Sequence, residues 1–202
     1  RGFPMSLSAI LFLYGPLLVL APTVFWGLGR VLYLKHAKDI TVLSFMSQKK
    51  TPAELGLAVI AISLNSYLFL RPFISGLDQK LLAFSSSYPI WGFITMITGM
   101  GLMVASQARM GGAWRIGVPK ERETSQTLVT SGLYRYSRNP IYIGIMLFLL
   151  GTVLTIPGPV TILSLIGTFL LLHPIIKREE ASMAAIFGTE YATYCHEVRR
   201  WL

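Results

Sequence analysis

The chain has 202 residues, of which 53% are hydrophobic and 13% are charged, a balance that excludes an ordinary soluble domain and favours a protein embedded in a bilayer. Its net charge of +9 does not indicate nucleic-acid binding, because the 18 basic residues lie between apolar runs and form no stripe with interleaved aromatic residues. A single cysteine, Cys195, excludes an intrachain disulfide, and without a Cys/His cluster we expect no metal site.

Three apolar segments are long enough to cross the bilayer as helices, which takes about 20 mainly apolar residues. They are residues 7–34, 53–75 and 88–108. A fourth apolar block, residues 141–176, is long enough to cross twice, because the Ile-Pro-Gly-Pro turn at 156–159 folds it into a helical hairpin. We therefore predict an all-α fold: a polytopic transmembrane helical bundle of about five helices with a C-terminal helical hairpin.

Basic residues are distributed unevenly between the two sides of this predicted bundle. Five lie in segment 30–50, six in segment 109–140 and four in the C-terminal tail, whereas Arg1, Arg71 and Lys80 lie on the opposite side. Because basic loops remain cytoplasmic, we predict the N-terminus outside and the C-terminus in the cytoplasm. The inner (plasma) membrane of a prokaryote would suit so short a chain.

No Pro/Ser-rich or charge-rich linker divides the chain, so we predict one integral membrane domain, residues 1–202. Residues 5–108 would form three N-terminal transmembrane helices, and residues 109–202 the part that carries the chemistry.

Two polar residues lie in the second span. We expect Asn65 to form an interhelical hydrogen bond, and Arg71 to extend from the end of its helix to the membrane interface.

The stretch from Arg109 to Gly144 is too polar to cross the bilayer, yet it holds four aromatic residues, Trp114, Tyr134, Tyr136 and Tyr142. Such residues could line a site or form an interfacial aromatic belt. Pro140 is expected to begin a helix, because its missing N–H is no loss in the first turn. Gly144 would then allow close approach of a neighbouring helix or of a bound ligand.

A pattern in three parts runs through the C-terminal half. Residues 126–144 are QTLVTSGLYRYSRNPIYIG, residues 177–180 after the hairpin are KREE, and residues 187–191 are FGTEY. This order resembles the isoprenylcysteine carboxyl methyltransferase and phospholipid methyltransferase superfamily, whose pattern is approximately LVT-x-G-x-Y-x-x-x-RHPxYxG, a hydrophobic hairpin, a Glu-Glu pair and FG-x-E-Y-x-x-Y. The resemblance covers roughly residues 109–202.

The resemblance implies an integral membrane methyltransferase that uses S-adenosylmethionine as its cofactor, bound by cytoplasmic segments. Its acceptor would be lipid-like or isoprenoid, and the carboxylate of an isoprenylcysteine is among the candidates. Membrane lipids would surround the protein. The acceptor's identity and the oligomeric state stay open. The implied cofactor-binding residues are Gln126, Thr127, Leu128, Val129, Tyr134, Asn139, Pro140, Ile141, Tyr142 and Glu179.

Two positions depart from the family pattern. Asn139 stands where the family has histidine; it can donate and accept hydrogen bonds but cannot carry charge. Ile175 stands four residues before Glu179, where carboxyl methyltransferases have an arginine for the substrate carboxylate. A carboxylate acceptor would therefore need Lys177 or Arg178 in place of that arginine.

The chemistry of the donor favours the same region independently. Glu179 and Glu180 directly follow a long apolar helix, where an unpaired carboxylate is poorly solvated and a bound cation would stabilise it. The alternative for this pair is an ion pair with Lys177 or Arg178, and Arg138 could either pair with a glutamate or bind the cofactor carboxylate.

Methyl transfer from a sulfonium needs alignment and exclusion of water but no metal. The catalytic residue is unknown. If the acceptor is an amine, which must first lose a proton, the candidate bases are His173, Glu180 and Tyr136.

Two other functions stay open. Sterol reductases that use NADPH share a related C-terminal pattern, including a Tyr-Cys pair like Tyr194-Cys195, but generally show RHPNYxGD where this chain has RNPIYIGI. A non-catalytic membrane scaffold is the third possibility. A soluble methyltransferase is excluded because the Gly-rich strand-to-helix turn is absent.

Overall fold

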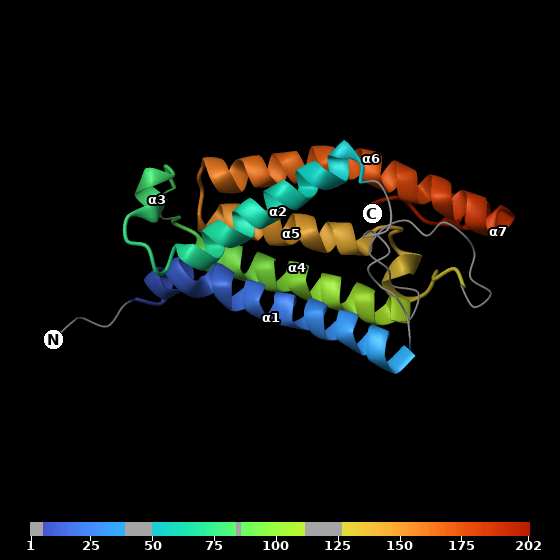
Figure 1. Ribbon diagram of the computed structural model, residues 1–202, viewed down its shortest axis with the longest axis horizontal. Helices are drawn as coiled ribbons and strands as arrows, with labels where there is room; N and C mark the ends of the chain where they lie inside the picture. Colours follow the sequence, from blue (N-terminus) through green and yellow to red (C-terminus); the bar gives the residue numbers. More distant parts are fainter. Residues whose placement is uncertain (1–5, 39–49, 84–85, 112–126) are drawn as a thin grey trace.

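The computed structural model describes residues 6–38, 50–83, 86–111 and 127–202 (Figure 1). Within these segments all regular structure is helical, which confirms the predicted all-α class. The long helices are α1 (Leu7–Lys38), α2 (Pro52–Leu70), α4 (Pro89–Met110), α5 (Pro140–Thr155) and α6 (Pro159–Phe187). The short elements are α3 (Leu77–Lys80), the 3-10 turn η3 (Gly132–Arg135) and α7 (Thr189–Glu197).

Four of the described helices, α1, α2, α4 and α6, are long and apolar enough to cross a membrane, and α5 is a shorter apolar helix of 16 residues. A helix of that length rises about 24 Å, somewhat less than the hydrocarbon core. The predicted hairpin is present, since α5 ends at Thr155 and α6 begins at Pro159. The predicted bundle of about five apolar helices is thus confirmed, although only four of the described helices meet the length for crossing a membrane and α5 is shorter.

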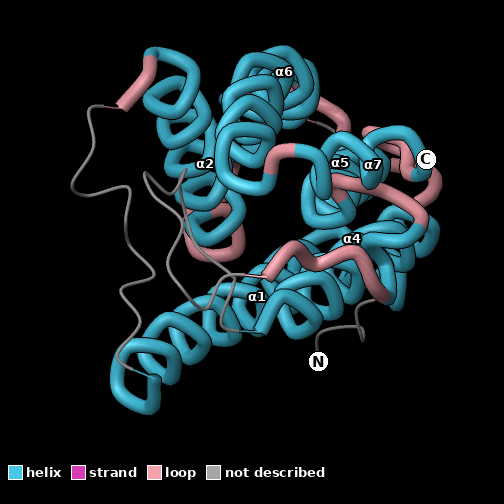
Figure 2. The backbone as a smooth tube through the Cα atoms, turned by 90° about the vertical axis from the view of Figure 1, so that its right-hand side faces the viewer, coloured by secondary structure: helices cyan, strands magenta, loops and turns pink. Residues whose placement is uncertain are grey.

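The helices form two pairs with α5 between them. Viewed end-on, α1 lies along α4, and α2 lies along α6 (Figure 2). The last turns of α1, α4 and α6 and the first turns of α2 and α5 lie at one end of the bundle, together with η3 and α7 (right in Figure 1). We call this the basic end, because described basic residues from all three predicted segments lie there, among them Arg30, Arg138 and Arg178. Helix α3 lies at the opposite end.

Helices α4 and α5 are antiparallel, and four glycines bring their backbones into contact. A Cβ at Gly99 would lie 2.6 Å from the Gly144 carbonyl oxygen, and a Cβ at Gly151 would lie 2.6 Å from the Gly92 carbonyl oxygen. On each helix the two glycines are seven residues apart, so both contacts fall on one face. Small residues allow transmembrane helices to approach closely. The expected close helix approach at Gly144 is therefore present.

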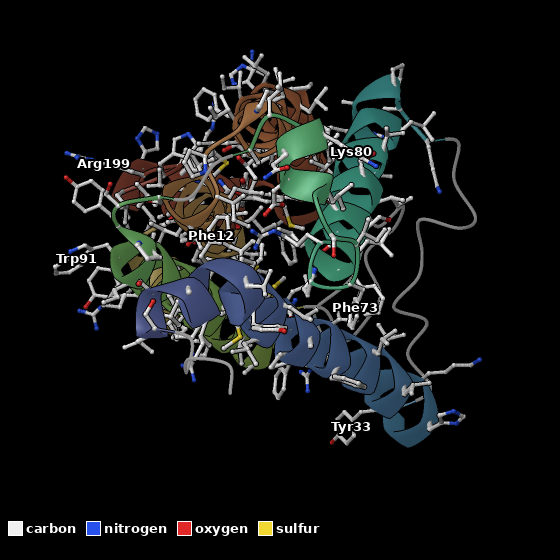
Figure 3. The ribbon with its side chains drawn as sticks, turned by 90° about the vertical axis from the view of Figure 1, so that its left-hand side faces the viewer. Phe12, Tyr33, Phe73, Lys80, Trp91 and Arg199 are labelled. Atoms are coloured by element: carbon white, nitrogen blue, oxygen red, sulfur yellow. The ribbon has the colours of Figure 1, made fainter. Side chains whose placement is uncertain are left out.

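Arg71 does not extend to the interface as expected. It is 4% exposed, and its guanidinium pairs with Asp78 of α3 at 2.6 Å and donates to the Phe12 and Leu13 carbonyl oxygens of α1. Figure 3 views this end of the bundle, with Phe12 and Lys80 labelled. Pro16, four residues after Phe12, has no N–H for that carbonyl. The expectation is wrong because Arg71 binds the acceptor that the proline leaves open.

Asn65 does not form the interhelical hydrogen bond that the sequence predicted. Its side-chain amide donates to the Ala61 carbonyl oxygen at 2.6 Å, within α2. A polar side chain on a transmembrane helix can satisfy its donor on the preceding turn. The expected interhelical hydrogen bond is therefore replaced by one within the helix.

Candidate functional site

Tyr142 and Glu179 meet at the basic end. Pro140 begins α5, as predicted, which places Tyr142 in the first turn. Helix α6 continues beyond its apolar part, so Glu179 lies opposite that turn. The Tyr142 hydroxyl donates to Glu179 Oε1 at 2.7 Å, and both side chains are partly buried. The structure thus brings together two predicted cofactor-binding residues that are 37 positions apart.

Glu179 has no counter-ion within the described part of the chain. None of the ion pairs between described residues includes it, and the charged groups that act on it most strongly are two other carboxylates, Glu54 and Glu180. A partly buried carboxylate in such surroundings is stabilised by a cation. The site is therefore chemically suited to a ligand with a positive charge.

Tyr134 borders the same site from η3. It is 7% exposed, and the Tyr194 hydroxyl of α7 donates to its carbonyl oxygen at 2.6 Å. Burial raises the pKa of Tyr134, and the nearby Tyr194 and Glu179 raise it further. Burial also raises the pKa of Tyr194 to about 12, although Arg138 acts in the opposite direction. Both hydroxyls consequently stay protonated at neutral pH.

The segment before α5 is bound to the C-terminal tail. The Arg138 N–H donates to the Arg199 carbonyl oxygen at 3.0 Å, and the Asn139 side-chain amide donates to the Arg200 carbonyl oxygen at 3.0 Å. We call these two bonds the tail clasp. Asn139 therefore uses its donor in a structural bond that needs no charge, and its predicted contact with the cofactor stays a prediction. Pro140 is buried and Ile141 is half-buried beside it.

Glu180 lies in a network of two ion pairs. Arg138 binds its carboxylate at 2.9 Å, and Arg200 Nε binds it at 3.0 Å. Arg138 also donates to the carbonyl oxygens of Cys195 and Val198. The hydrogen bonds with Glu180 raise the pKa of Arg200. Of the two alternatives for Arg138, the structure contains the pairing with a glutamate. A carboxylate bound by two arginines is stabilised in its charged form, which makes Glu180 a weak base.

The other two candidate bases, His173 and Tyr136, lie apart from the Tyr142–Glu179 pair. His173 is exposed on α6, and Tyr136 is 61% exposed with the Arg135 guanidinium 4.8 Å above its ring. Neither shares a described hydrogen bond with Tyr142 or Glu179. The geometry gives no support to a base at either position.

The predicted segment 126–129 leads into η3. Leu128 packs against an apolar cluster at the end of α6, on α7 and directly after α7, formed by Phe187, Tyr191, Tyr194 and Val198. Val129 is half-buried and Thr127 is exposed, while Gln126 lies outside the described residues. Packing of Leu128 fixes the direction of the chain as it approaches Tyr134.

Glu54 at the start of α2 is a neighbour of the site that the sequence interpretation missed. The Thr51 N–H donates to Glu54 Oε2 at 2.7 Å, and the Glu54 N–H donates to Thr51 Oγ1 at 3.3 Å, which is a capping box. The Glu54 carboxylate pairs with Arg178 at 3.3 Å. Arg178 therefore binds α2 and not its neighbours in the acidic pair. The Thr-Pro-Ala-Glu sequence at 51–54 was the signal for the cap.

Comparisons with known proteins place these elements in a family context. A family model described as phospholipid methyltransferase matches residues 88–190, just over half of the chain. The match includes α4, so it begins earlier than the resemblance at 109–202 suggested, and it ends at the start of α7. The glycine contacts between α4 and α5 give a physical reason for α4 to belong to the same unit.

Several curated relatives are protein-S-isoprenylcysteine O-methyltransferases. The Homo sapiens protein is 29% identical over 106 residues, which cover 52% of this chain and 37% of that protein. The Schizosaccharomyces pombe protein is 30% identical over 108 residues, covering 53% and 45%, and the Saccharomyces cerevisiae protein is 26% identical over 144 residues, covering 70% and 58%. The chain thus spans less than two thirds of each of these relatives.

A solved structure of the eukaryotic intramembrane Ras methyltransferase, isoprenylcysteine carboxyl methyltransferase, is also similar. The identity is 20%, the match covers 95% of this chain and 71% of that one, and the TM-score is 0.46.

Proposed function

The chain belongs to the phospholipid methyltransferase family, and we propose that it is an integral membrane enzyme that transfers a methyl group from S-adenosylmethionine to a lipid-like acceptor. The donor would bind at the basic end, between the first turn of α5 and the part of α6 that carries Glu179. The reductase alternative loses support, because the family model and the curated relatives are methyltransferases.

One observation carries this proposal: the Glu179 carboxylate, whose described hydrogen bond comes from the Tyr142 hydroxyl and which takes part in none of the described ion pairs. A membrane protein does not gain stability from an unneutralised carboxylate at such a position. Binding of a cationic ligand would offset that cost. The donor, with its sulfonium and ammonium groups, has the required charge.

The residues of the site would have distinct tasks. S-adenosylmethionine supplies a methyl group that is already activated by its bond to a sulfonium sulfur. Glu179 would balance the positive charge, and Tyr142 would hold the carboxylate in place through the 2.7 Å hydrogen bond. Buried Tyr134 would help to exclude water. The tail clasp would hold residues 138–139 rigidly, which keeps the donor and acceptor aligned.

The acceptor is proposed to be lipid-like or isoprenoid. The isoprenylcysteine carboxylate is the first candidate, because the curated relatives are named for it. Ile175 is 9% exposed and apolar, so the carboxylate would need another cation than the family arginine. Arg178 is paired with Glu54, and Lys177 is exposed. A phospholipid amine is the second candidate, since the family model is described by phospholipid methylation.

The distribution of basic residues supports a proposed orientation. The basic end would face the cytoplasm, where a soluble donor is available, with the N-terminus on the other side of the membrane. The plasma membrane of a prokaryote is the proposed location. The acceptor would enter from the bilayer between helices.

Purified protein incubated with radiolabelled S-adenosylmethionine tests the function directly. One arm contains a prenylated cysteine analogue and another contains phospholipid vesicles with amine headgroups. Label transferred to either lipid supports the proposal and identifies the acceptor class. A Tyr142→Phe variant should bind the donor about tenfold more weakly, because a hydrogen bond to a charged group is lost. Binding of NADPH without binding of the donor would refute the proposal, and binding of neither would favour a scaffold.

A further inference from the structure

Glu54 reaches the site from the half of the chain that the family model does not match. The capping box fixes the start of α2 at the basic end, and α2 lies along α6 (Figure 2). This arrangement brings the Glu54 carboxylate to Arg178, the residue next to Glu179 on α6. The distances from Arg178 Nη1 to the two Glu54 oxygens are 3.3 and 3.4 Å.

The Glu54 carboxylate does more than hold two helices together. Its ion pair with Arg178, the neighbour of Glu179 in the chain, brings its charge to the site, where it acts electrostatically on the Glu179 carboxylate and on the Tyr142 hydroxyl. Glu54 and Arg178 are 30% and 40% exposed at their side chains, so water moderates their interaction. Glu180, the other acidic neighbour, is already paired with Arg138 and Arg200.

We propose that Glu54 is a specificity-determining residue, whose negative charge beside that of Glu179 makes the site prefer a cationic methyl donor to its neutral thioether product. The inference rests on the proposed function. S-Adenosylmethionine carries one positive charge more than S-adenosylhomocysteine, because loss of the methyl group converts the sulfonium to a thioether. A carboxylate near the sulfonium stabilises the bound donor but not the bound product to the same extent, so the donor binds more strongly and the product is released.

Charge variants separate this role from a purely structural one. Glu54→Gln removes the charge but retains the capping box, because glutamine also fits at that position. The ratio of product Kd to donor Kd, measured calorimetrically on purified protein, should fall about two- to fivefold. Arg178→Gln should raise the same ratio by a similar factor. The double variant should return it to the parental value, because the net charge of the group is restored.

A structural role predicts a different pattern. If Glu54 served only to hold α2 against α6, the two single variants and the double variant would all change donor and product affinity together and in one direction. That result would overturn the inference, as would an unchanged ratio in Glu54→Gln. Glu197→Gln, an equal charge change at an exposed position at the end of α7, should leave the ratio unchanged. A parent protein that binds neither compound would instead refute the proposed function itself, and the inference with it.

Discussion

Replacing Gly99 with alanine tests the contact that joins α4 to α5. The added Cβ would lie 2.6 Å from both the Gly144 carbonyl oxygen and the Phe148 nitrogen, and 3.2 Å from the Leu147 carbonyl carbon. All three are backbone atoms, so no side chain can rotate away, and the helices must separate. Overpacking of this kind costs about 1–3 kcal/mol. Because Gly144 lies in the turn after Tyr142, the same shift should weaken donor binding.

Gly101 provides a matched control on the same helix. A Cβ there would meet nothing within 4 Å, and alanine is the better helix former by about 1 kcal/mol. Thermal unfolding in detergent should therefore show a melting temperature for Gly99→Ala that is about 2–10 °C below the parent. Gly101→Ala should melt at or above the parent. Equal melting temperatures for the two variants would refute the proposed backbone contact.

Three further predictions concern the polar contacts. Arg71→Ala should lower the stability by about 3 kcal/mol in chemical unfolding, because it leaves Asp78 and the carbonyls of α1 without their cation; a loss below about 1 kcal/mol would contradict the account. Burial acts to raise the pKa of Asp78, but hydrogen bonds from Arg71 and Tyr67 outweigh it and lower that pKa. The Asp78 carboxylate therefore contributes stability above its ordinary pKa of about 4, and this contribution is lost as the pH falls through the lower pKa of the folded protein. Asp78→Asn should remove this part of the acid sensitivity, measured as stability against pH. An unchanged acid transition in this variant would contradict the prediction. Arg200→Ala should cost about 1 kcal/mol by removing one of the two ion pairs of Glu180, measured by the same unfolding assay, and a variant as stable as the parent would show that the pair contributes nothing.

The helices could be predicted from the sequence because their cause is local. Twenty apolar residues in a row have few alternatives to a membrane helix, and the proline-glycine turn at 156–159 divides the hairpin wherever its partners lie. The start of α5 at Pro140 was equally local. The proximity of Tyr142 and Glu179 could be predicted for a different reason. The family resemblance assigns both residues to one cofactor site, although they are distant in the sequence.

Contacts between distant segments could not be predicted where no family pattern links the two positions. The pairing of Arg71 with the carbonyl of Phe12 needs two facts together: Pro16 frees that acceptor, and α1 lies beside the end of α2. The sequence showed the proline but not the neighbour. Glu54 was missed for the same reason, because its capping box is local whereas its partner Arg178 lies 124 residues away.

The most direct test of the central claim is the affinity of the Glu179→Gln protein for S-adenosylmethionine, measured by calorimetry beside the parent and Glu197→Gln. Removal of one partner from a partly buried charge pair predicts a loss of roughly thirtyfold or more, with a melting temperature of the unliganded protein at or above that of the parent and parental affinity for Glu197→Gln. A Glu179→Gln protein that is folded and binds the donor as tightly as the parent would contradict the account.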